Sequence, residues 1–132
     1  MSETDDEREQ IREQKREELK SRAGGETPDE PVEVSGNAQL QDLVAEHHIV
    51  LVDCYADWCG PCKMMEPVVA DLAADTDAVV AKVDVDTNQE IAAQLGAQSI
   101  PTFVLFVDGE PTERLVGAQD ENTFRQLIEQ AG

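Results

Sequence analysis

The sequence has few basic side chains and no long apolar run. Lysine and arginine together number 10 against 29 aspartates and glutamates, which gives a formal net charge of -19 at pH 7. Such a chain repels nucleic acid phosphates and anionic lipid headgroups, so we exclude both as partners. The apolar run Ile49 to Val52 near the centre is far shorter than the roughly 20 residues of a membrane-spanning helix. We therefore expect neither a nucleic-acid-binding protein nor a membrane protein.

Cysteine is also scarce, and the N-terminus lacks the features of an export signal. The first ten residues, MSETDDEREQ, have neither a basic start nor an apolar stretch, so we expect a cytoplasmic protein. In that reducing compartment, a C-x-x-C pair among three cysteines indicates redox chemistry or metal binding rather than a framework of structural disulfides.

A zinc site is the metal alternative, with Cys54, Cys59, Cys62 and either His47 or His48 as ligands. Structural zinc usually takes two ligand pairs at turn-like spacing, and the second pair is absent here. We therefore predict no metal. The two histidines are expected to end the first helix instead, where cationic side chains are favourable.

The chain divides into two segments of different composition. Residues 1–31 form a charged N-terminal extension in which Ile11 and Leu19 are almost the only large apolar side chains, so this segment cannot bury a core. We expect it to be disordered or loosely helical. Glycines and prolines then indicate a linker, at Gly24, Gly25, Pro28 and Pro31. Residues 32–132 are long enough to form one globular domain.

Strand and helix patterns alternate through this domain. The sequence predicts strands over residues 32–34, 49–55, 79–85, 102–107 and 112–116, and helices over 39–46, 59–74, 89–95 and 123–130. The nearly continuous apolar stretch 49–55 is typical of a central strand covered on both faces. Asp108-Gly109 is a strong signal for a turn between two antiparallel strands. The order predicts an α/β fold with a mixed central sheet of about five strands, flanked by about four helices.

The C-x-x-C pair follows the predicted central strand and begins a helix. With Cys59 at the helix start, unpaired backbone amides and the positive end of the helix dipole favour the thiolate, which is the form that attacks disulfides. Cys62 lies one turn further on, close enough to attack a mixed disulfide at Cys59 and release the substrate. Pro61 suits a first helical turn, where its missing amide hydrogen has no partner to lose. The motif therefore predicts thiol–disulfide exchange.

Asp53 is the acidic residue of the otherwise apolar stretch 49–55. A buried carboxyl group is costly unless it is well paired or its proton equilibrium is used. Burial should raise the pKa of Asp53 and make it a competent base near neutral pH. A hydrogen-bonded core aspartate without a catalytic role is the alternative.

These motifs resemble those of the thioredoxin family. The resemblance lies in WCGPCK at residues 58–63, the preceding VLVD at 50–53, IPT at 100–102, AKVDVD at 81–86 and VGA at 116–118, all in the family's order and spacing. It covers residues 32–132 and implies the thioredoxin fold.

The resemblance also implies roles for individual residues. Cys59 would be the attacking nucleophile, Cys62 the resolving thiol and Asp53 the proton acceptor that helps deprotonate Cys62. Lys82 would lie near Asp53. In the family, the proline that corresponds to Pro101 is cis and faces the cysteine pair. The implied contact surface for substrates is small and apolar, and consists of Trp58, Gly60, Pro61, Ile100, Pro101, Gly117 and Ala118.

The Gly-Pro dipeptide between the cysteines resembles the reducing members of the family. It implies a protein-disulfide reductase that keeps cytoplasmic thiols reduced and donates electrons to client enzymes. The expected partners are a thioredoxin reductase, as electron donor, and disulfide-containing client proteins. We expect a monomer without a bound cofactor. The alternative is a redox-idle thioredoxin-fold binding module that is recruited through the N-terminal extension.

Cys54 departs from the family pattern, in which an aromatic residue usually follows the buried aspartate. A buried thiol in apolar surroundings has a raised pKa and behaves as a small hydrophobic group. We therefore interpret Cys54 as a packing residue, with a third redox thiol as the alternative.

Acidic side chains are spread along the domain, where residues 32–132 carry 18 of them against 4 basic side chains. Such self-repulsion destabilises a compact state, and concentrated salt screens it, because the Debye length falls to about 3 Å at 1 M. We therefore predict a salt-adapted cytoplasm, such as that of a halophilic archaeon. The alternative is an ordinary acidic protein that its charge keeps in solution.

Overall fold

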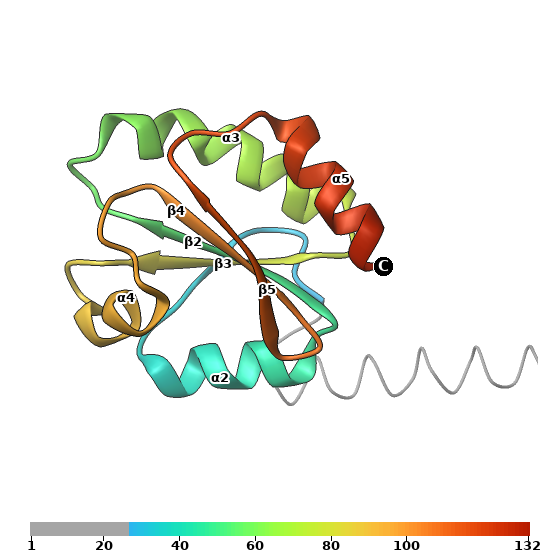
Figure 1. Ribbon diagram of the computed structural model, residues 1–132, viewed down its shortest axis with the longest axis horizontal. Helices are drawn as coiled ribbons and strands as arrows, with labels where there is room; N and C mark the ends of the chain where they lie inside the picture. The colour runs from blue at the N-terminus through green and yellow to red at the C-terminus, as the bar shows by residue number, and fades with distance from the viewer. Residues whose placement is uncertain (1–26) are drawn as a thin grey trace, which may run out of the picture.

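The computed structural model describes residues 27–132, so the predictions for the N-terminal extension lie outside the described residues except at its end. The described elements follow one another as β1 (Val32–Glu33), α2 (Asn37–Glu46), β2 (Ile49–Tyr55), α3 (Gly60–Asp75), β3 (Val79–Asp84), α4 (Gln89–Leu95), β4 (Thr102–Val107), β5 (Glu110–Val116) and α5 (Glu121–Ala131). Figure 1 shows them arranged around one central sheet.

The sheet has five strands in the order β1-β3-β2-β4-β5. β1 and β2 both pair with β3 in parallel, whereas β4 pairs antiparallel with β2 and with β5. The predicted mixed sheet is therefore confirmed, and β2 is its middle strand. Every residue of β2 except the last is buried, as expected of a strand covered on both faces.

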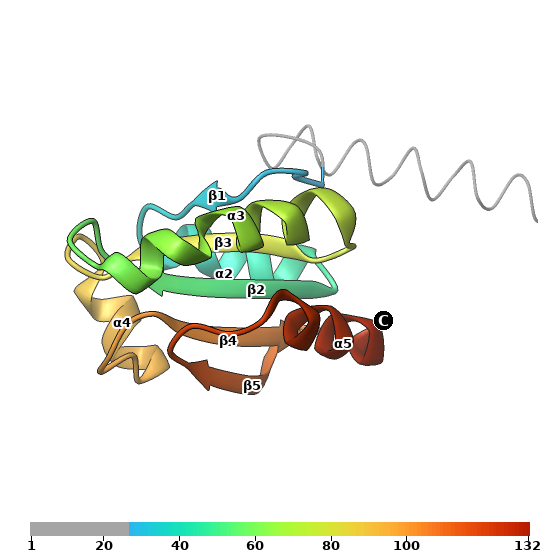
Figure 2. The same cartoon turned by 90° about the horizontal axis from the view of Figure 1, so that it is seen from above.

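Helices cover both faces of the sheet (Figures 1 and 2). Val50 and Val52 of β2 pack in one apolar cluster with residues of α2 and α4, whereas Ile49 and Leu51 pack in another with residues of α3 and α5. Because side chains alternate along a strand, Cys54 faces α2 and α4, and Asp53 faces the opposite side.

Most element boundaries agree with the sequence analysis, and the differences lie at polar ends. Helix α2 begins at Asn37 and strand β5 at Glu110, both two residues before their predicted starts, because the added residues carry no large apolar side chain that extends the periodic pattern. The β4–β5 turn is confirmed: Asp108 and Gly109 have φ angles of 54° and 85°, which suit a tight hairpin. Gly96 ends α4 in the left-handed conformation, with φ 68°.

Pro67 lies inside α3, and the helix continues past it to Asp75. His47 follows the last residue of α2 and caps it, with its amide donating to the Leu43 carbonyl. Over residues 27–132, no helix combines the length and the apolar character needed to cross a membrane.

Candidate active site

The two cysteines lie where β2 has ended and α3 begins. Cys59 is the residue that caps α3, and Cys62 lies in the first turn of this helix, after Pro61. The backbone N–H of Cys62 donates to the Cys59 Sγ atom at 3.2 Å. A disulfide joins the two side chains, whose Cα atoms are 5.3 Å apart. The predicted redox pair is thus assembled at a helix N-terminus, and both residues are almost fully buried.

Trp58 directly precedes Cys59 in the chain, and its side chain is 71% exposed. Its indole Nε1 donates to the Asp86 carboxylate at 2.9 Å. Asp86 follows β3 and was not among the predicted site residues, because its position beside Trp58 depends on how the ends of β2 and β3 align. This hydrogen bond fixes a large exposed ring next to the disulfide.

The Ile100–Pro101 peptide bond is cis, the isomer that the resemblance implies. Ile100 packs against the small cluster of Ala56 and the two cysteines. The Gly117 amide donates to the Pro101 carbonyl at 2.7 Å, which brings the segment after β5 beside this proline. The remaining residues predicted to contact substrate, Gly60, Pro61 and Ala118, are exposed.

Asp53 is 2% exposed, and its Oδ1 atom has no hydrogen-bond partner. Burial raises the pKa of this carboxyl group to about 6. The Lys82 ammonium opposes that rise in pKa, whereas the negative charges of Glu33 and Glu66 add to it. The predicted direction of the pKa shift is therefore confirmed, and the predicted hydrogen-bonded alternative is not favoured for Oδ1.

Lys82 lies next to Asp53, because the two residues are partners in the parallel register of β3 and β2. Its Nζ atom lies over the ring of Tyr55, 4.3 Å from the ring centroid. The Tyr55 hydroxyl donates to Glu33 in the edge strand β1 at 2.5 Å. Sequence reasoning missed Tyr55 and Glu33. Alternation along the strands places both on the face of Asp53, but only the register of β1 on β3 brings Glu33 to Lys82.

Cys54 is fully buried on the face opposite to Asp53. Burial, and to a smaller degree the charge of Asp53, raise the pKa of the Cys54 thiol to about 12. Such a thiol is not ionised near neutral pH, which agrees with the interpretation as a packing residue.

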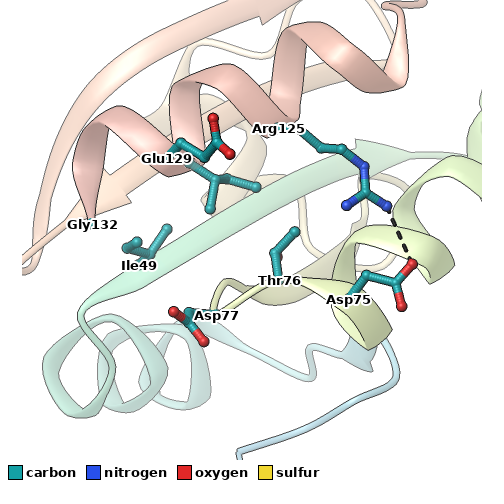
Figure 3. Close-up of a pocket in the computed structure, with 8 residues that line it drawn as sticks. Ile49, Asp75, Thr76, Asp77, Arg125, Glu129 and Gly132 are labelled. Carbon is teal, nitrogen blue, oxygen red and sulfur yellow. Dashed lines mark hydrogen bonds and ion pairs between the residues drawn. The ribbon is translucent and has the colours of Figure 1, made fainter.

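A pocket of about 380 Å³ lies at the other end of the sheet (Figure 3). It lies where β2 begins and α3 and α5 end, and Arg125 at its edge donates to Asp75. Glu121 accepts a second hydrogen bond from Arg125. The pocket contains no sulfur or other redox group. Among residues 27–132, no group of three or more His, Cys, Asp or Glu side chains is placed to hold a metal ion.

Comparison with known proteins agrees with the geometry of the cysteine pair. The sequence profile of the thioredoxin family matches residues 31–130. A thioredoxin from Mycobacterium bovis is 47% identical over 90 residues, which are 67% of this chain and 78% of the relative. A thioredoxin from Chlamydia muridarum is 43% identical over 98 residues, or 74% of this chain and 95% of the relative.

Structural comparison also finds thioredoxins. The solved structure of a mutant thioredoxin from Halobacterium salinarum NRC-1 is 53% identical, covers 80% of this chain and 93% of its own, and superposes with a TM-score of 0.78. The described domain therefore has the thioredoxin fold, and its Cys59–Cys62 pair is a redox-active disulfide that carries out thiol–disulfide exchange. The chain belongs to the thioredoxin family of protein-disulfide oxidoreductases.

Proposed function

We propose that the protein reduces disulfides of client proteins, with Cys59 as the nucleophile and Cys62 as the resolving thiol. The observation that supports these roles is the position of Cys59 as the capping residue of α3, where its Sγ atom accepts the Cys62 amide hydrogen. A backbone amide and the helix dipole both stabilise negative charge at this sulfur. Cys62 is also a cysteine and lies one turn further along α3, but it does not cap the helix.

The reaction has two exchange steps. The Cys59 thiolate attacks one sulfur of the client disulfide, a mixed disulfide forms, and the other client sulfur leaves as a thiolate. The Cys62 thiolate then attacks the Cys59 sulfur, and the second client sulfur leaves. The client gains two electrons and two protons, and the protein ends with the Cys59–Cys62 disulfide that the structure contains. A reductase returns two electrons to this disulfide.

Asp53 is the proton acceptor for Cys62 in this proposal. Its pKa of about 6 leaves it largely ionised at neutral pH, yet basic enough to accept a proton from a thiol. The unpaired Oδ1 atom is free to receive that proton. Lys82 moderates the pKa of Asp53, since its positive charge favours the carboxylate.

The contact surface for clients combines the predicted apolar residues. Trp58 is exposed and anchored, and Gly60 and Pro61 are exposed beside it at the start of α3. The segments around Gly117 and the buried Pro101 are joined by their backbone hydrogen bond. Main-chain groups beside Pro101 would pair with an extended client segment. Ile100 and Ala118 complete the surface. Such a surface recognises exposed disulfides with little discrimination among side chains.

We propose a reductase-driven role in the cytoplasm of a salt-adapted cell. Thioredoxins act with thioredoxin reductases and disulfide-containing clients, and these are the partners we propose for this chain, with the protein acting as a monomer. The acidic composition of residues 32–132 and the 53% identity to a thioredoxin from Halobacterium salinarum both support salt adaptation. Stability measured against KCl concentration tests it, and equal stability at low and high salt would count against salt adaptation.

Reduction of insulin disulfides by dithiothreitol in molar KCl tests the assigned nucleophile. The intact protein should accelerate the reaction, Cys59→Ser should abolish the acceleration, and Cys54→Ala should retain it, since that thiol is buried away from the site. Equal activity of the intact protein and Cys59→Ser would refute the role of Cys59. It would favour the redox-idle binding module, which the assembled disulfide does not favour.

A further inference from the structure

Three charged side chains form a row across neighbouring strands beside the cysteine pair. Glu33 in β1 aligns with Lys82 in β3, and Lys82 aligns with Asp53 in β2, each in parallel register. Leu51 and Val80, two residues before Asp53 and Lys82, pack with residues of α3. Since side chains alternate along a strand, the whole row lies on the α3 side of the sheet. Lys82 therefore stands between a buried carboxylate and an exposed one.

The Lys82 ammonium pairs with neither carboxylate. Among the ion pairs of residues 27–132, none joins Lys82 to Asp53 or to Glu33. Its Nζ atom instead lies over the Tyr55 ring, 4.3 Å from the centroid, where the electron-rich face of a ring attracts a cation. The Tyr55 hydroxyl is held by Glu33. Glu33 thus fixes the ring, and the ring holds the ammonium.

This arrangement keeps a cation away from an oxygen that has no partner. The Asp53 Oδ1 atom is buried and accepts no hydrogen bond, and a cation placed on it would favour the charged carboxylate. An exposed ion pair with Glu33 would stabilise little, whereas an unpaired buried carboxylate oxygen is costly. If the Tyr55 ring were removed, Lys82 would therefore move to Asp53 rather than to Glu33.

We infer that Tyr55 is a positioning residue for the exchange reaction: its ring, held by Glu33, keeps the Lys82 ammonium off Asp53, so that Asp53 retains the proton affinity to accept the Cys62 proton. Tyr55 acts through Lys82. The inference rests on the proton-acceptor role proposed above for Asp53.

Other charged groups also act on these residues, and their effects on the pKa of Asp53 have to be separated from the effect of Lys82. Glu66 of α3 acts on Asp53, and Asp84 of β3 and Asp57 of the β2–α3 loop act on Tyr55. Strand β4 places the uncharged Phe103 opposite Asp53. All three carboxylates stay in place when only the ring is changed, so a comparison of ring variants isolates the contribution of Lys82.

The test is a double-mutant cycle read by NMR titration of the Asp53 carboxyl carbon. The oxidised full-length protein is used at fixed KCl concentration, because Cys59 and Cys62 do not titrate while they are bridged. Tyr55→Leu should move the midpoint of Asp53 protonation to lower pH by about one pH unit, the usual scale for an opposite charge brought close to a carboxylate. In the Lys82→Met background, Tyr55→Leu should leave the midpoint unchanged.

Tyr55→Phe is the matched control, because it keeps the ring under Nζ and should shift the midpoint less than Tyr55→Leu does. No downward shift in Tyr55→Leu would overturn the inference. An equal shift in the presence and absence of Lys82 would overturn it too, since the ring would then act on Asp53 directly.

A second cycle covers the case that Tyr55→Leu does not fold. Glu33→Ala removes an exposed side chain and loosens the ring, so it should also move the Asp53 midpoint to lower pH. The charge of Glu33 also acts on Asp53 directly, so in the Lys82→Met background the shift should become smaller without vanishing. Glu66→Ala is its control, because Glu66 acts on Asp53 by charge alone and its effect should persist without Lys82. A Glu33→Ala shift that persists equally would contradict the inference.

The rate of the second exchange step separates this inference from the role of Asp53. If Tyr55→Leu shifts the Asp53 midpoint as expected, and the acid limb of the rate-against-pH profile moves with it, the inference on Tyr55 and the proton-acceptor role of Asp53 are both supported. If the midpoint moves and the rate profile does not, the positioning of Lys82 stands as a structural effect, while the proton-acceptor role, and with it the mechanistic inference, fails.

Discussion

The two ends of strand β2 differ in whether their polar side chains have hydrogen-bond partners. Where β2 begins, His48 bonds through one ring nitrogen to Asp108 at 2.6 Å and through the other to the Ala131 carbonyl at 3.0 Å. Arg125, near the same end, binds two carboxylates. Where β2 ends, Asp53 is buried with an oxygen that has no partner.

The difference separates groups that stabilise the fold from the carboxyl group that we propose as the base in the reaction. Across residues 27–132, Asp53 Oδ1 is the one buried side-chain nitrogen or oxygen without a hydrogen-bond partner. Leaving it unpaired costs stability, because the charged carboxylate is poorly solvated there. The gain is a base whose pKa lies near neutrality. We therefore predict that activity and stability oppose each other at this end of the sheet and not at the other.

The largest effect should come from Asp53→Asn on the release of mixed disulfides. Without a proton acceptor for Cys62, the second exchange step should slow by about 10²-fold at pH 7 to 8, the lower range for general base catalysis. Below about pH 6 Asp53 of the unchanged protein is itself protonated, so the two rates should converge. Stopped-flow kinetics of release across this pH range checks the prediction, and equal rates at pH 8 would contradict it.

Asp53→Asn should at the same time stabilise the fold above pH 6. The pKa of Asp53 is raised from 3.8 to about 6, so its contribution to stability is present below pH 3.8 and is lost as the pH rises through 6. The neutral amide avoids that loss, which corresponds to about 3 kcal/mol at pH 8. Urea unfolding in molar KCl at pH 8 and pH 4 measures it. A gain in the free energy of unfolding that is the same at both pH values would contradict the titration argument.

Cys54→Ala should have a smaller effect, on stability alone. The side chain is fully buried on the face opposite to Asp53, and its removal leaves a small cavity that costs about 1 kcal/mol. Disulfide reduction should keep its normal rate. Mass spectrometry after mild oxidation or alkylation of the native protein should find no modification at Cys54, and an adduct there would support the alternative of a third redox thiol.

The smallest effect should come from His48, at the other end of β2. Its bond to Asp108, and next its bond to the Ala131 carbonyl, raise the pKa of His48 above 6.5. The protonated ring therefore stabilises the fold below pH 6.5, and this contribution is lost as the pH rises through the raised pKa. His48→Gln should lower Tm modestly at pH 5.5 and less at pH 9, with activity unchanged.

Asp108→Asn is the matched control for His48→Gln, because asparagine tolerates the positive φ of this turn position while the negative charge is removed. It should lower Tm at pH 5.5 as His48→Gln does. A Tm difference that is greater at pH 9 than at pH 5.5 in both variants would show that the ring does not act as a cation.

The sequence allowed much of this site to be predicted because its main parts are local. Cys59 and Cys62 lie in one helical turn directly after an apolar strand, and a carboxyl group within such a strand indicates a raised pKa without any knowledge of the fold. The cis bond before Pro101 could be predicted only from the family resemblance, since nothing in the local pattern favours a cis isomer.

The partners of Lys82 and Trp58 could not be predicted in the same way. The contact of Lys82 with Tyr55 and the hydrogen bond between Trp58 and Asp86 join residues of different strands and loops. Both depend on the register of parallel strands, which no hairpin turn fixes and which the crossover helices determine only after packing. Glu33 belongs to a strand of two residues, too short for its pattern to show a facing side.

The central claim is that Cys59 attacks the client and Cys62 releases it, and trapping the mixed disulfide tests it most directly. Cys62→Ser, incubated with a disulfide-containing client in molar KCl, should accumulate a covalent complex whose peptide map places the client sulfur on Cys59. Cys59→Ser under the same conditions should accumulate far less. A client sulfur found on Cys54, or equal complexes with both variants, would contradict the account.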